Sequence, residues 1–232
     1  MNKSLLGASL VALALAVPLA HAHEAGDIIL RAGAITVNPK ADSSSVKVDQ
    51  GPLSGADLGG KATMSSDTQL GLNVAYMITN NWGIELLAAT PFEHDVKLKG
   101  TSLGAANGKL GTLKHLPPTL SVVYYPLDAK SDFQPYVGAG INYTYIYDEH
   151  VGSEAQAKGW SNFKAENSWG MAFQVGADYM ITDHIMLNAQ VRYIDIDTRA
   201  TVENDAVAPG TRARVNVDVD PFIYMVGLGY KF

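Results

Sequence analysis

Histidines and acidic residues are the side chains of this sequence with the clearest capacity for metal or acid–base chemistry. The sequence has six histidines, and one of them, His21, lies in a segment that we expect to be removed. The others are scattered over expected loops, turns and the new terminus, and no two have the i, i+2 or i, i+4 spacing of a zinc pair; they are His23, His94, His115, His150 and His184. Glu93-His94-Asp95 could bind a cation weakly, but we favour a solvated loop there. We therefore expect no metal site.

The residues needed for other catalytic chemistry are not arranged in recognisable patterns. Cysteine is absent, which removes disulfides, thiolate nucleophiles and Cys-rich zinc sites. The sequence has no G-x-S-x-G elbow, and Gly138-x-Gly140 and Gly227-x-Gly229 are not followed by the helix that a nucleotide-binding fingerprint needs. With 23 acidic and 17 basic residues the net charge is -6, which disfavours nucleic-acid binding. We expect neither an enzyme nor a cofactor.

Two acidic pairs are further candidates for ion binding. Asp195 with Asp197, and Asp218 with Asp220, fall near one rim of the expected fold. They could bind divalent cations, or they could stay hydrated. We favour hydration.

The first 22 residues are typical of a secretory signal peptide. Lys3 supplies positive charge, Leu5 to Val17 form a short apolar segment, Pro18 breaks it, and Ala20-His21-Ala22 fits an A-x-A cleavage site. The apolar segment is shorter than the about 20 residues that a membrane-spanning helix needs. We expect residues 1–22 to be cleaved and residues 23–232 to form one exported domain.

Beyond this segment, apolar residues repeatedly alternate with small or polar ones, the period-two pattern of strands with two unlike faces. Eight runs show it: 27–37, 67–78, 82–92, 117–125, 134–147, 168–179, 185–196 and 215–232. Long and short connections alternate between them, as in outer-membrane barrels with tight turns at one end and long loops at the other. The long connections, 38–66, 93–116, 148–167 and 197–214, are rich in Gly, Ser, Ala and Asp. We expect them to be solvated and mobile.

One face of the strands carries aromatic residues at both ends and apolar residues between them. From Trp169 to Tyr179 is roughly 33 Å along a strand, which a tilt near 40° reduces to about 25 Å, the height of a membrane barrel's apolar band. Equivalent positions predict two aromatic girdles: Trp82, Tyr124, Tyr179, Tyr230 and Phe232 at the turn end, and Tyr145, Tyr147, Trp169 and Phe222 at the loop end.

Backbone polar groups in hydrocarbon all need partners, so such strands must close on themselves. A secreted β-sandwich is the soluble alternative, but sandwiches rarely place aromatics at both ends of an exposed face. The sequence predicts an all-β fold: an eight-stranded antiparallel transmembrane up-and-down β-barrel with four long extracellular loops and both termini in the periplasm.

Several stretches carry a family resemblance that covers the whole chain after the signal peptide. They are 116–119 (LPPT), 134–143 (QPYVGAGINY), 168–170 (SWG), 193–198 (YIDIDT), 218–221 (DVDP) and the closing 229–232 (GYKF). The chain resembles the OmpW family of small outer-membrane barrels, in its OprG-like branch. The resemblance implies a channel for passive uptake of small hydrophobic molecules, which leave sideways through the barrel wall into the outer membrane. The closing aromatic residue, Phe232, is of the kind that the barrel-assembly machinery reads.

The inward positions predict a lumen that changes along its height. An eight-stranded barrel holds only side chains or one small ligand, so a water-filled porin is excluded. Four inward residues near the turn end predict a charged floor, Arg31, Glu85, Asp178 and Lys231, and the higher ones are small or apolar: Leu87, Ala89, Gly140, Ala172 and Ile223. Arg192 adds a charge, and we favour its pairing with Glu85 or Asp178 over its binding a carboxylate or amino-acid head group.

Prolines predict where a guest could leave. Proline cannot donate to a sheet ladder; Pro91 lies high on the third run, and Pro117-Pro118 open the fourth. Because unpaired backbone is costly in lipid, we expect a lateral gate at Pro91, Phe92, Pro117 and Pro118, unless these prolines merely end strands above the membrane.

Two other functions remain open beside a channel for hydrophobic molecules. They are a channel for small amino acids and a structural or adhesion barrel with a plugged lumen. The expected partners are outer-membrane lipid, lipopolysaccharide and small hydrophobic solutes. The divalent ions that bridge lipopolysaccharide are the cations that the two acidic pairs could bind.

Overall fold

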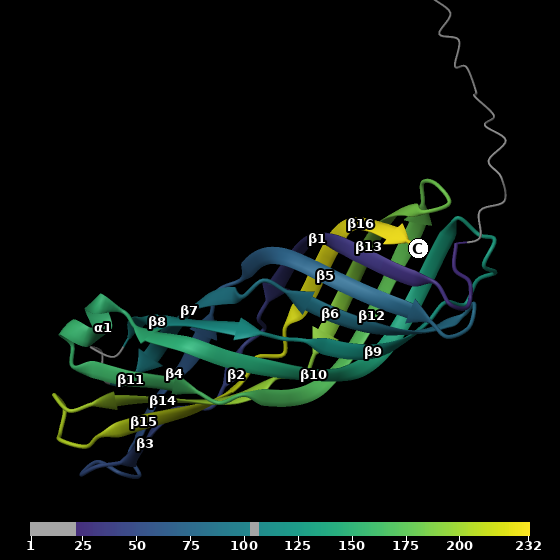
Figure 1. The fold of residues 1–232 in the computed structure, drawn as a ribbon. Coiled ribbons are helices and arrows are strands. Elements are labelled where there is room, and N and C mark those ends of the chain that lie inside the picture. The colour runs from purple at the N-terminus through teal and green to yellow at the C-terminus, as the bar shows by residue number, and fades with distance from the viewer. Residues whose placement is uncertain (1–21, 103–106) are drawn as a thin grey trace, which may run out of the picture.

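A computed structural model describes residues 22–102 and 107–232. Most of the predicted signal peptide, residues 1–21, lies outside the described part of the chain. The described residues form an elongated tube of strands with a short helix, α1 (Ser153–Ala157), at the end opposite to the C-terminus (Figure 1). None of the helical structure in these residues has the length and hydropathy needed to cross a membrane.

Eight strands close into a ring that we call the closed barrel. Each pairs antiparallel with its neighbours, and the ring is completed by β9 on β10 and by β16 on β1. Its strands are β1 (Ile28–Asn38), β5 (Asp67–Met77), β6 (Trp82–Ala89), β9 (Thr119–Tyr124), β10 (Phe133–Val151), β12 (Ser168–Met180), β13 (Ile185–Ile194) and β16 (Phe222–Lys231). The predicted eight-stranded antiparallel barrel is confirmed.

The outer face of the closed barrel is a belt of exposed apolar side chains. Of the large exposed hydrophobic residues in the described ranges, all but Leu53, Val207 and the C-terminal Phe232 belong to the closed barrel or its tight turns. Aromatic rings pair at both ends of this belt: Trp82 with Tyr124 and Tyr230 with Phe232 near the turns, and Tyr145 with Tyr147 and Tyr193 with Phe222 at the other end. Tyr179 and Trp169 are also exposed. A two-faced sheet of this kind buries its polar lumen and offers its apolar side to lipid.

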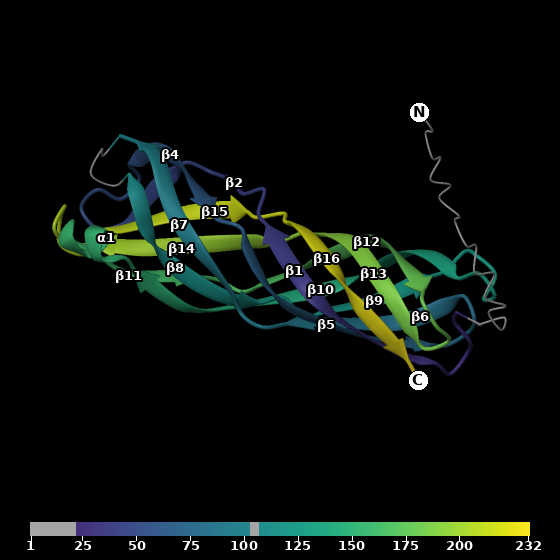
Figure 2. The same ribbon diagram turned by 90° about the horizontal axis from the view of Figure 1, so that it is seen from above.

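The expectation of solvated, mobile loops is wrong, because the long connections continue the tube as strands. They are β2 (Asp42–Ser43), β3 (Val46–Gln50), β4 (Asp57–Met64), β7 (Phe92–Thr101), β8 (Gly108–Leu116), β11 (Trp160–Ala165), β14 (Asp197–Asn204) and β15 (Arg212–Asp218). They pair in the order β10-β8-β7-β4-β3-β15-β14-β11, with β2 on β15. We call this part, with the second half of β10, the extension; Figure 2 shows it in line with the closed barrel.

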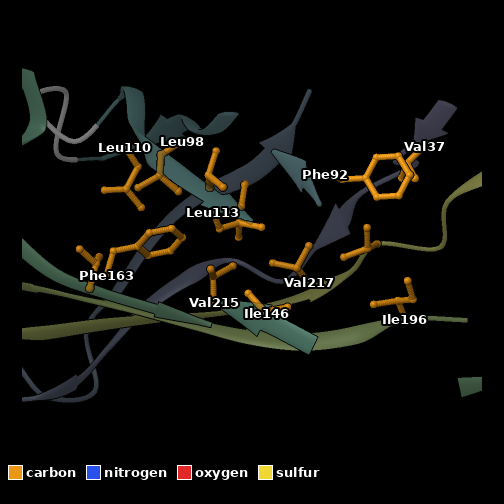
Figure 3. Close-up of a cluster of buried hydrophobic side chains, with 14 of the residues drawn as sticks. Val37, Phe92, Leu98, Leu110, Leu113, Ile146, Phe163, Ile196, Val215 and Val217 are labelled. Atoms are coloured by element: carbon orange, nitrogen blue, oxygen red, sulfur yellow. The ribbon is translucent and has the colours of Figure 1, made fainter. Parts of the chain in front are cut away.

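A hydrophobic core inside the extension stabilises these strands. Figure 3 shows Leu98, Leu110, Leu113, Phe163 and Val215 pointing into it from facing strands, and all are buried. Burying each such side chain contributes about 1.5–3 kcal/mol. Trp160 is buried here too, so these connections contribute aromatic residues to the core.

Candidate channel lumen and lateral seam

A fully buried ionic network crosses the interior of the closed barrel. Arg31 on β1 binds Asp178 on β12 in bidentate fashion, with Nε to Oδ1 at 2.9 Å and Nη2 to Oδ2 at 2.6 Å. The same guanidinium donates to Asn73 Oδ1 (3.2 Å), Glu85 Oε2 (3.4 Å) and the Tyr125 hydroxyl (2.8 Å). Such bidentate, charge-assisted pairs are the strongest protein hydrogen bonds.

Glu85 connects this network to a second arginine. Arg192 Nη2 lies 2.7 Å from Glu85 Oε1 and also donates to Gln174 Oε1, and Gln174 Nε2 donates to Glu85 at 2.9 Å. Arg192 therefore pairs with Glu85, as we favoured from the sequence, while its Nε and Nη1 are buried without a hydrogen-bond partner. Two arginines thus lie among two carboxylates. Lys231 lies at the end of β16, with Nζ 3.8 Å from Asp27.

Above the network, the lumen becomes apolar. Leu87, Ala172 and Ile223 are buried in the same cluster as the extension core, and Ala89 packs against it. Gly140 has little room beside it: a Cβ there would collide with the Leu120 carbonyl oxygen, so β9 itself occupies that space.

Two narrow apolar cavities of about 30 Å³ each lie in this part of the tube. The first is lined mainly by Val37, Leu113, Ile146, Ile196, Val219 and Pro221. The second is lined mainly by Leu98, Leu110, Phe163, Val215 and Val217. Met64, Leu113 and Thr198 border both cavities, so the two adjoin.

The sheet pairing is interrupted where the closed barrel meets the extension. The β6–β9 ladder ends at Leu87 opposite Thr119, and the β7–β8 ladder begins at Phe92 opposite His115. Pro91 on one side and Pro117-Pro118 on the other lie in the interval between them. Pro91 and Pro118 are exposed, whereas Phe92 and Pro117 are buried. The three prolines supply no amide donor across this interval, which we call the seam.

Comparison with known proteins identifies the architecture. The model of the OmpW family matches residues 24–232. The chain belongs to the OmpW family. It is 41% identical to outer membrane protein W of Vibrio cholerae, over the full length of both chains. It is also 41% identical to outer membrane protein W of Escherichia coli, over 99% of this chain and 100% of that one.

Solved structures agree with this assignment. The crystal structure of the outer membrane protein OprG from Pseudomonas aeruginosa is 47% identical, with a TM-score of 0.84 over 91% of this chain and 98% of that one. This OmpW-family protein is therefore an outer-membrane β-barrel, and the predicted family and membrane are confirmed.

Two histidines of this OmpW-family protein meet, although the sequence spacing suggested that they were scattered. His94 on β7 and His115 on β8 are buried, with their Nε2 atoms 2.8 Å apart. Phe92 packs against both rings. The available signal was the alternation of Phe92, His94, Val96 and Leu98, which predicts a strand with both Phe92 and His94 on its inner face.

The acidic pairs also come together, at the junction of β13, β14 and β16. Asp195, Asp197 and Asp220 place carboxylate oxygens within 4.8 Å of one another. Partial desolvation, and then the charges of Asp195, Asp218 and Asp220, raise the pKa of Asp197. Asp195 and Asp197 are exposed and Asp220 is half-buried. The cluster fits either a hydrated group or a divalent cation held with lipopolysaccharide, the two alternatives raised by the sequence.

Proposed function

We propose that this OmpW-family protein is a passive channel for small hydrophobic molecules, which enter the extension from outside the cell and leave sideways at the seam. The observation that carries the proposal is the change in the lumen: apolar side chains line the extension, and the buried ionic network lies beneath them. An apolar guest that moved straight on would have to displace paired buried charges, which costs several kcal/mol per uncompensated ion. A lateral exit avoids that cost.

The seam supports this exit. Prolines interrupt the ladder on both strands, so opening the wall there breaks fewer backbone hydrogen bonds than opening it elsewhere. The strand on the far side, β10, is continuous from Phe133 to Val151. Tyr143 on β10 still donates its amide to Pro118 O at 3.1 Å, which favours opening between β6 and β9 rather than between β9 and β10.

The proposal includes an orientation and a set of partners. The two ends of the described chain lie at the tight-turn end of the tube, where the Phe232 amide donates to Ile28 O. We place that end in the periplasm and the extension outside, next to lipopolysaccharide. Phe232 is exposed at the C-terminus, in a position suited to the barrel-assembly machinery. No catalytic step is part of the proposal.

Two alternatives also have specific support. The unpartnered Nε and Nη1 of Arg192 could bind the carboxylate of a small amino acid that reached the network. The continuous polar network itself is what a structural or adhesion barrel with a plugged lumen would have. The apolar extension core favours hydrophobic cargo over both.

Flux into lipid vesicles separates these functions. Vesicles with the purified protein are offered an alkane, a small aromatic or a small amino acid, and uptake is compared with that of empty vesicles. We expect uptake of the first two only. Uptake of none would refute the channel, and uptake of the amino acid alone would favour the Arg192 alternative.

Pro91→Ala tests the lateral exit. The substitution restores an amide donor at the seam, so we expect uptake of the alkane to fall several-fold while the barrel still folds. Pro126→Ala is the matched control, because Pro126 is exposed in the turn between β9 and β10, away from the seam. Unchanged uptake in Pro91→Ala would remove Pro91 from the mechanism.

A further inference from the structure

The histidine pair at the seam has a fixed arrangement of protons. His94 Nδ1 lies 2.6 Å from the carbonyl oxygen of Ser65, and a carbonyl only accepts, so Nδ1 carries the hydrogen. In the neutral ring, His94 Nε2 is then an acceptor. The 2.8 Å contact between the two Nε2 atoms consequently requires that His115 Nε2 donates.

This chain of donors ends in an unused lone pair. With its hydrogen on Nε2, neutral His115 has an acceptor at Nδ1, and that atom is buried without a hydrogen-bond partner. Burial and then the neighbouring His94 lower the pKa of His115 to about 3. Burial also lowers the pKa of His94. Both rings therefore stay neutral at ordinary pH, and the acceptor persists.

His115 lines the first apolar cavity, and the other polar side chains around it are occupied. Thr144 Oγ1 donates to Asn142, Thr198 Oγ1 donates to the Glu166 carbonyl, and His94 is bonded at both nitrogens. A buried acceptor that lacks a donor costs about 1–3 kcal/mol. A guest that brought a hydrogen to His115 Nδ1 would recover that cost.

The position of His115 relates this acceptor to the exit. His115 is paired with Phe92, the first residue of β7 after the seam. The first cavity has room for a group of about the size of one water molecule. The second apolar cavity adjoins it across Met64, an unbranched side chain that repacks easily. A polar head could thus lie at His115 and an apolar body in the extension.

We propose that His115 Nδ1 binds the hydroxyl of an apolar guest, so that the channel prefers long-chain alcohols and similar uncharged hydrogen-bond donors to plain hydrocarbons. A carboxylate head would bring a second acceptor and be repelled by the lone pair, and an ammonium head would leave most of its charge unpaired in an apolar cavity. This inference rests on the proposed function and specifies its cargo.

Uptake of octanol and octane, which differ by one hydroxyl, tests the preference in the same vesicles. A hydrogen bond of this kind contributes about 0.5–1.5 kcal/mol, equal to roughly 2- to 12-fold in affinity. We expect His115→Phe, which retains an aromatic ring, to lower octanol uptake by about that factor relative to octane uptake. His150→Phe is the control, because His150 is exposed on the extension. Equal effects of His115→Phe on both solutes would overturn the inference while leaving the channel intact.

Nitrogen NMR of histidine-labelled, unsubstituted protein tests binding without flux and without a variant. Octanol should shift the His115 Nδ1 resonance as the lone pair accepts a hydrogen, and octane should not. If neither solute or both solutes shifted it alike, the hydroxyl contact would be excluded. If the resonance shifted with octanol but neither solute entered the vesicles, the binding site would stand and the proposed channel would fail.

Discussion

Replacing Arg31 with methionine should destabilise the barrel much more than replacing Arg192 with methionine. Each substitution removes one buried positive charge beside Glu85 and leaves the same net charge in the network. The two arginines differ in how well their donors are satisfied. The comparison therefore measures hydrogen-bond geometry rather than total charge.

The magnitudes follow from the contacts. Without Arg31, Asp178 loses its bidentate partner and retains Asn188 and His23, so we expect a loss of about 3–5 kcal/mol, as for other broken buried ion pairs. Without Arg192, Glu85 retains Arg31 and Gln174. The substitution also removes two unpartnered donors, each of which costs about 1–3 kcal/mol in the folded protein. We expect a loss of about 1–2 kcal/mol.

Urea unfolding of the barrel in lipid vesicles, followed by tryptophan fluorescence, measures both free energies of unfolding. Arg199→Met is the control: Arg199 lies on the surface of the extension in an exposed contact with Glu166 at 3.5 Å, and such pairs contribute at most about 1 kcal/mol. Equal losses for Arg31→Met and Arg192→Met would refute the argument that the satisfied donors of Arg31 determine the stability of the network.

Three further outcomes test the extension and the C-terminus. The free energy of opening of β7 and β8, measured by hydrogen exchange, should be highest above pH 6.5 and should fall by up to about 1.4 kcal/mol per pH unit towards pH 3. The reason is that histidine in the unfolded chain takes up a proton near pH 6.5, whereas in the folded protein the pKa of His115 is lowered to about 3. A free energy that did not change with pH would contradict this. Phe163→Ala should lower the stability of the extension by about 3–5 kcal/mol, so that protease cleaves the extension while the closed barrel survives. Lys164→Ala is the control, because Lys164 is the exposed neighbour of Phe163. Equal protease resistance of the two variants would argue against a core in the extension. Phe232→Ala should lower the amount of barrel in the outer membrane, measured by immunoblot of membrane fractions, and normal amounts would exclude a role for that ring in assembly.

Alternation in the sequence was sufficient to predict the closed barrel, because its two faces meet chemically opposite surroundings. Along β12, Trp169, Phe173 and Tyr179 face outward and are exposed, while Gln174 and Asp178 are buried. Lipid on one side and a narrow polar lumen on the other impose that contrast on every residue of the strand. The same parity identified Arg31, Glu85, Asp178 and Arg192 as inward.

Only the tertiary structure determined which of these inward groups meet and what the long connections do. Glu85 and Arg192 are far apart in the sequence, and the barrel register alone brings them to 2.7 Å. The outer faces of the extension strands carry few large apolar residues, and their inner faces bury small residues such as Ala62 and Ala213, so their composition matches that of loops. Their stability comes from pairing with one another around a shared core, and the His94–His115 contact at the seam exists only once β7 and β8 are paired.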